Sequence, residues 1–61
     1  MTRTELEKAG AALYGSRWQS ALARRLLVDS RTVRRWISGE REIPGPAIAA
    51  IELLLKHPEE A

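Results

Sequence analysis

The sequence predicts an all-α fold, a compact bundle of about four short helices that forms one domain over residues 1–61. Apolar residues recur at intervals of three and four along the chain, and no stretch alternates apolar and polar residues for long. A chain of 61 residues is too short to divide into two domains. It contains no cysteine, so no disulfide or thiolate metal site can brace the fold. We therefore expect hydrophobic packing between the helices to hold it together.

The first helix is expected to begin after Thr4, because the Thr4 hydroxyl can cap free backbone amides while Glu7, three residues later, reaches back. Gly15 is expected to end this helix. Gly10 lies on its apolar face, where glycine costs about 1 kcal/mol relative to alanine. We prefer the interpretation that Gly10 lets another helix approach closely over that of a plain defect in helix propensity.

A second helix is expected over about residues 17–26, because Ser16 and Gln19 repeat the capping-box spacing. The residues that share its inward face are Leu22, Ala23 and Leu26. Trp18 has two open interpretations, since its ring can pack over the start of this helix or donate its indole N–H to a phosphate. Packing is the preferred interpretation.

A third helix is expected over Ser30 to Ser38, capped by the Asp29 carboxylate at its start and ended by Gly39 in a left-handed conformation. The apolar residues of this helix gather on one face: Val33, Trp36 and Ile37. The opposite face carries Arg31, Arg35 and Ser38, with Arg34 beside them. Trp36 is therefore expected in the core rather than as a platform for stacking bases.

The last helix is expected to include Pro46 in its first turn and to run to about Lys56, before Pro58. The residues on the arc expected to cover the core are Ala47, Ile48, Ile51, Leu54 and Leu55. A second, smaller stripe is a candidate homodimer surface, although small exposed apolar groups are also common on monomers. This stripe consists of Ala49, Ala50 and Leu53.

Charge is concentrated in the middle of the chain. Residues 16–41 hold seven arginines and two acidic residues, a net charge of +5, whereas residues 42–61 sum to −3. No acidic residue lies inside the third helix, so its arginines are expected to lack local partners. An arginine guanidinium can bind a phosphate or the O6 and N7 atoms of guanine through two donors at once, which a lysine cannot do. The arginines therefore predict that this helix faces nucleic acid.

Composition excludes several other classes of protein. There is no glycine-rich phosphate loop and no paired-carboxylate motif, so we expect no enzyme, no cofactor and no small-molecule substrate. His57 is the only histidine and is expected near the end of the last helix, without companion metal ligands. The longest apolar runs are too short to cross a bilayer and the N-terminus is unlike a signal peptide, so we expect a cytoplasmic protein.

The stretch "SRTVRRWISGEREIP", with the helix before it, resembles the helix-turn-helix of the phage repressor and Cro-like DNA-binding family. The resemblance covers about residues 4 to 56 and is specific over residues 19 to 45. It implies that base edges in the major groove are contacted by Ser30, Arg31 and Arg35. It implies that the DNA backbone is contacted by Gln19, Thr32, Arg34 and Arg41, with the minor groove as the alternative for Arg41.

One position departs from the family pattern. Leu27 stands in the turn between the two helices, where the family usually has glycine. A leucine forced to a positive φ costs about 1 to 2 kcal/mol, so either the turn is strained or its geometry differs.

The function expected from these features is that of a sequence-selective regulator of transcription, of a bacterial or phage type, which binds double-stranded DNA. Members of the family often bind paired half-sites as homodimers. The alternative is a helix-turn-helix that serves as a protein adaptor, such as an antitoxin-like or assembly subunit, whose arginine face meets an acidic partner. A net charge of only +2 leaves that alternative open.

Overall fold

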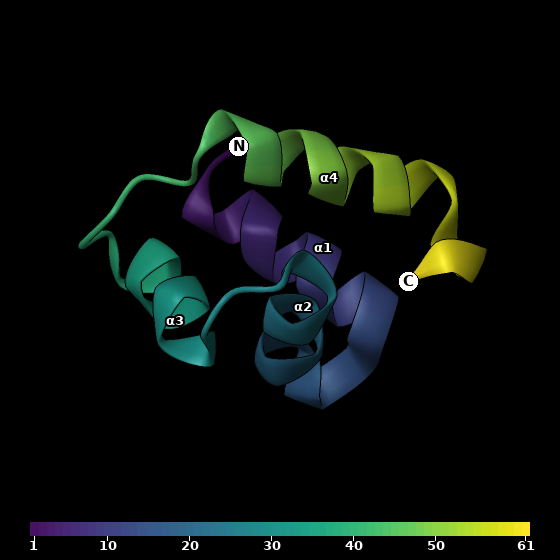
Figure 1. The fold of residues 1–61 in the computed structure, drawn as a ribbon, viewed down its shortest axis with the longest axis horizontal. Coiled ribbons are helices and arrows are strands. Elements are labelled where there is room, and N and C mark those ends of the chain that lie inside the picture. The colour runs from purple at the N-terminus through teal and green to yellow at the C-terminus, as the bar shows by residue number, and fades with distance from the viewer.

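A computed structural model describes all 61 residues and contains four α-helices and two short 3₁₀ helices, with no strand (Figure 1). The prediction of an all-α bundle is confirmed. The elements in chain order are α1 (Arg3–Tyr14), η1 (Gly15–Arg17), α2 (Trp18–Leu26), α3 (Ser30–Ser38), α4 (Gly45–Lys56) and η2 (Pro58–Glu60). None of these helices combines the length and the apolar character needed to cross a membrane.

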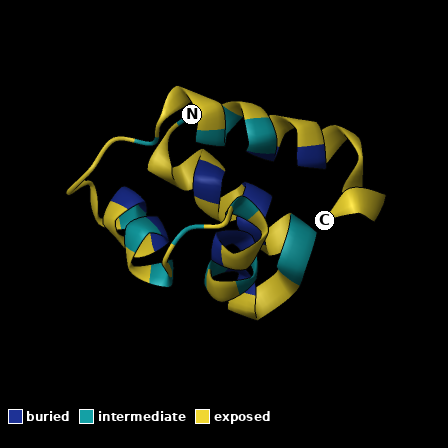
Figure 2. Ribbon diagram, viewed as in Figure 1, coloured by how far each residue is buried: buried dark blue, intermediate teal, exposed yellow.

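Helix α1 is the hub of the bundle, because it packs against α2, α3 and α4. Helices α2 and α3 lie side by side below it in Figure 1, and α4 crosses above. All four helices contribute to one buried cluster, which forms the inner face of each ribbon in Figure 2. Its members are Leu6, Ala9, Trp18, Leu22, Ala23, Val33, Trp36, Ile51 and Leu54. Burial of these side chains is the main source of stability in a chain without disulfides.

Helix α1 begins one half-turn earlier than the sequence predicts, so the expected cap at Thr4 is wrong. The capping box is formed by Thr2 and Glu5: the Glu5 amide donates to the Thr2 hydroxyl at 3.1 Å, and the Thr2 amide donates to the Glu5 carboxylate at 2.7 Å. Two overlapping Thr-x-x-Glu patterns compete at this terminus. The earlier one puts Met1 just before the cap, where it packs against the core as a hydrophobic staple does.

The approach of Trp18 to Gly10 fixes how α2 lies against α1. Trp18 is the first residue of α2, and a Cβ atom added at Gly10 would overlap its indole ring. Only a hydrogen atom at Gly10 leaves room for the ring, which is 8% exposed. Both preferred interpretations are confirmed, close approach for Gly10 and packing for Trp18.

The expected Ser16 cap of α2 is wrong. Ser16 lies within η1, whose last residue directly precedes α2, and no side chain caps α2. A 3₁₀ turn that leads into an α-helix satisfies backbone groups that a hydroxyl would otherwise bind. Helix α2 ends as predicted at Leu26.

Helix α4 starts as expected, with Pro46 in its first turn, and ends at Lys56. Ile51 and Leu54 are buried, whereas Ala47 and Ile48 are half-buried. Leu55 was expected on the core but is 41% exposed, because it lies at the edge of the inward arc in the last turn of the helix. Beyond α4, the His57 ring lies 3.5 Å from the Glu59 carboxylate.

Candidate nucleic-acid interface

Helix α3 has the limits and the orientation that the sequence predicts. The Asp29 carboxylate accepts a hydrogen bond from the Arg31 amide at 3.0 Å, which caps the start of the helix. Gly39, at φ 83°, ends it in the left-handed conformation. Val33 and Trp36 are buried, with exposed fractions of 0% and 3%. This inward face fixes which side of α3 remains at the surface.

Three residues, 27–29, join α2 to α3, and Leu27 takes the left-handed conformation with φ 60° and ψ 39°. The turn is closed by two backbone hydrogen bonds, from the Leu27 amide to the Arg24 carbonyl at 3.3 Å and from the Val28 amide to the Ala23 carbonyl at 2.9 Å. This is a Schellman-type helix end, in which glycine is the usual residue. Leu27 is 92% exposed. Of the two alternatives, the strained turn is therefore the one observed.

The face of α3 opposite the core carries three exposed arginines, Arg31, Arg34 and Arg35. Arg31 and Arg35 are one turn apart and project from the same side of the helix. No hydrogen bond or ion pair engages the side chain of Arg31 or Arg34. Two guanidinium groups therefore present all of their donors to solvent, in a row along one short helix.

Arg35 differs, and the expectation that all these arginines lack partners is wrong for it. Its Nε atom lies 3.3 Å from Oε2 of Glu40. Glu40 comes after Gly39, whose left-handed conformation turns the chain back so that the Arg41 amide donates to the Arg35 carbonyl at 3.2 Å. A helical wheel of α3 cannot show this contact, because Glu40 lies outside the helix.

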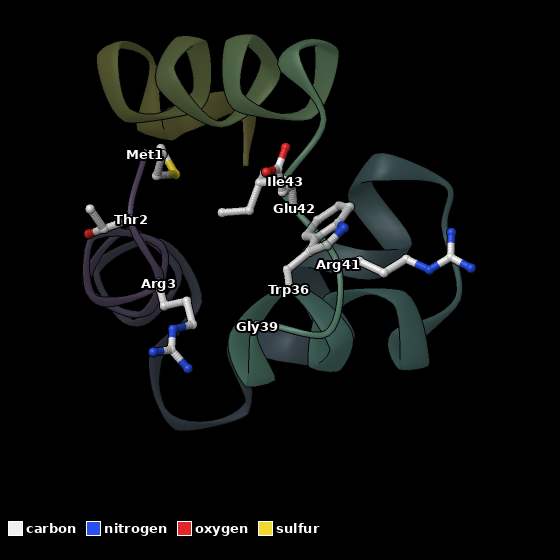
Figure 3. A pocket seen from close by; sticks show the side chains of 8 residues that line it. All are labelled: Met1, Thr2, Arg3, Trp36, Gly39, Arg41, Glu42 and Ile43. Carbon is white, nitrogen blue, oxygen red and sulfur yellow. The ribbon is translucent and has the colours of Figure 1, made fainter.

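The other residues expected at DNA differ in how far they are exposed. Ser30, Thr32 and Gln19 are half-buried, and Arg41 is exposed. Arg41 borders an open hollow of about 400 Å³ together with Trp36 and Arg3. Figure 3 shows the Arg41 and Arg3 side chains pointing away from each other on opposite sides of Trp36. Arg41 thus adds a cation beyond the end of α3, between the exposed carboxylates of Glu40 and Glu42.

Arg3 and Ser38 support α3 at its C-terminal end, a role that the sequence did not predict for either residue. The Arg3 guanidinium donates to the Ile37 carbonyl at 3.4 Å, so α1 holds a free carbonyl of the last turn. The Ser38 hydroxyl donates to the Arg35 carbonyl at 3.1 Å. A cation near a helix C-terminus is a recognisable pattern, but only the tertiary structure shows that the cation comes from 34 residues away.

The candidate dimer stripe on α4 is only partly exposed at the surface. Ala49 is exposed and Leu53 is 56% exposed, whereas Ala50 is half-buried beside an apolar hollow of about 280 Å³. The other residues that line this hollow are Leu26, Val28, Trp36, Pro44, Pro46 and Ala47. Self-association through the stripe stays a prediction.

No protein-family model, curated protein or solved structure matches this chain. No cluster of His, Asp and Glu side chains is arranged to hold a metal ion. What α3 offers is a short, rigidly packed helix with planar cationic donors on its outer face, a surface suited to phosphates and to base edges.

Proposed function

We propose that this protein is a sequence-selective regulator of transcription that places α3 in the major groove of double-stranded DNA. The observation that carries the proposal is the exposed row of Arg31, Arg34 and Arg35 on a helix whose other face is locked into the core. An α-helix fits the major groove, and arginine is the residue that most often reads guanine there. In this proposal α2, the turn at Leu27 and α3 form a helix-turn-helix.

Some of the residues expected at DNA would position the helix rather than read bases. Gln19 and Thr32 can donate to phosphates beside the groove, and Arg34 and Arg41 add charge along the DNA backbone. Ser30 stands at the start of α3, next to Arg31, where it can reach a base edge. Each phosphate contact should add about 0.9 to the slope of log affinity against log salt concentration.

The proposal places the protein in the cytoplasm of a bacterial cell, without a cofactor and without catalysis. It also includes binding as a homodimer through Ala49, Ala50 and Leu53, because regulators of this shape often read paired half-sites. A palindromic target would support the dimer, and a single half-site would contradict it.

The experiment that tests the function is selection of bound duplexes from a randomised DNA library at near-physiological salt. We expect the native protein to recover a motif that contains guanine. The Arg31→Ala/Arg35→Ala protein should lose that motif, because each bidentate arginine contact is worth about 1 to 3 kcal/mol of discrimination.

Arg17→Ala/Arg24→Ala is the matched control. Both of these arginines are exposed and take part in no side-chain hydrogen bond or ion pair, so the variant removes the same charge from another part of the surface. It should bind more weakly in a salt-dependent manner and keep the motif. If the native protein recovers no motif, the regulator is refuted and the alternative of an adaptor for an acidic protein partner takes its place.

A further inference from the structure

A small hydrogen-bonded network at the end of α3 places one carboxylate against one arginine. The Ser38 hydroxyl donates to the Arg35 carbonyl at 3.1 Å and accepts from the Glu40 amide at 3.4 Å. The Arg41 amide also donates to the Arg35 carbonyl, at 3.2 Å. The backbone of Glu40 is therefore tied to the last turn of the helix. Its carboxylate reaches back to Nε of Arg35 at 3.3 Å.

The atom of Arg35 that Glu40 engages decides what the guanidinium can still do. A guanidinium has five N–H donors, one on Nε and two on each terminal nitrogen. The Glu40 carboxylate forms its ion pair at Nε, 3.3 Å away, so the two terminal nitrogens keep all of their N–H groups and form a pair of parallel donors at the tip of the side chain. This is the pair that matches O6 and N7 of guanine. The carboxylate also offsets part of the charge that would otherwise draw Arg35 to the nearest phosphate.

We propose that Glu40 is a positioning residue that determines specificity: its carboxylate holds Arg35 on the Nε side, so that the two terminal nitrogens read guanine rather than a phosphate. The inference rests on the proposed function. It distinguishes Arg35 from Arg31, which the same helix exposes without a carboxylate partner. Arg35 would be the more selective of the two arginines, and Arg31 the more tolerant of other bases.

The pair is exposed, with side-chain exposures of 47% for Arg35 and 67% for Glu40, and exposed ion pairs contribute little to folding. Glu40→Gln should therefore unfold at nearly the same temperature as the native protein. Its effect should appear in DNA binding, because an arginine that is not held in place must be ordered when the complex forms.

The test measures affinity for the selected duplex and for the same duplex with adenine in place of the guanine whose selection is lost in Arg35→Ala. Glu40→Gln should reduce the preference for guanine by about 2- to 10-fold, the cost of ordering one long side chain. It should also bind unrelated DNA more tightly, because a carboxylate near the phosphates has been removed. Glu42→Gln is the matched control, since it removes one charge from the same loop and Glu42 is in no ion pair.

The outcomes separate the inference from the function on which it rests. Glu42→Gln should tighten binding to all sequences and keep the preference for guanine. If Glu40→Gln behaves as Glu42→Gln does, Glu40 acts through its charge alone and the inference is overturned while the function stands. If Arg35→Ala loses no guanine, Arg35 reads no base and the inference is overturned, whereas the function is overturned only if the native protein selects no motif.

A measurement on the protein without DNA provides a second readout. The Nε–H proton of Arg35 should exchange with water more slowly in the native protein than in Glu40→Gln, as followed by NMR. Equal exchange in the two proteins would show that the carboxylate does not hold Arg35 in solution, and would overturn the inference independently of any binding result.

Discussion

Replacing Leu27 with glycine should stabilise the protein slightly. Leu27 is the only residue other than glycine with a positive φ, at 60°. Holding a residue with a Cβ atom in the left-handed region costs about 1 to 2 kcal/mol. Because the Leu27 side chain is 92% exposed, its removal gives up only about 0.2 kcal/mol of hydrophobic burial. The strain therefore outweighs the packing that the side chain contributes.

An opposing effect comes from the unfolded chain. Glycine has more conformational freedom there than leucine, which lowers the stability of the variant by about 0.4 to 1 kcal/mol. The expected net gain is about 0.5 kcal/mol, which corresponds to an increase in Tm of about 2 to 4 °C for a chain of this size. Thermal unfolding followed by far-UV circular dichroism measures it directly.

Leu27→Ala is the control, because alanine removes the same exposed side chain but keeps the Cβ atom and hence the strain. The free energy of unfolding of Leu27→Ala should lie within about 0.5 kcal/mol of that of the native protein and below that of Leu27→Gly. The DNA binding that we propose should be unchanged in Leu27→Gly. A fall in Tm of more than about 4 °C in Leu27→Gly would refute the reasoning, since it would show that the leucine side chain packs against the core.

Three further changes test other parts of the fold. Gly10→Ala should destabilise the protein by about 1 to 3 kcal/mol in urea unfolding, because the added methyl group overlaps a buried indole ring. Gly45→Ala is the control: its added methyl group meets no other atom, so its stability should be equal to that of the native protein or higher. Asp29→Ala should cost about 1 kcal/mol by removing the cap of α3, and Asp29→Asn should retain most of that stability; equal losses in both would argue against the cap. Hydrogen bonds from the Thr2 amide and hydroxyl lower the pKa of Glu5, and Thr2→Ala removes only the hydroxyl, so it should raise that pKa part of the way to its usual value in an NMR titration. The folded pKa lies below the usual 4.5, so the stability that this pair contributes is present at neutral pH and is lost as the pH falls through the folded pKa.

The features predicted correctly from the sequence are those set by neighbouring residues. The limits of α3 follow from an acceptor at Asp29 and a glycine at position 39, each of which acts within one turn of the helix. The burial of Val33 and Trp36 follows from the helical repeat. The start of α1 was missed because two capping patterns overlap, and the choice between them depends on what Met1 and Arg3 contact elsewhere in the molecule.

The sequence by itself determined the all-α class, the last residue of α2 and both ends of α3. It also determined that α3 has an apolar face and an arginine face. These features depend on the spacing of residues along one chain segment. Only the tertiary structure decided that Trp18 packs on Gly10, that Leu27 accepts a strained conformation, and that Glu40 engages one arginine and leaves Arg31 free. These depend on where segments meet in space. A leucine can hold a left-handed conformation only because the packing of α2 and α3 on either side supplies the free energy that the turn costs.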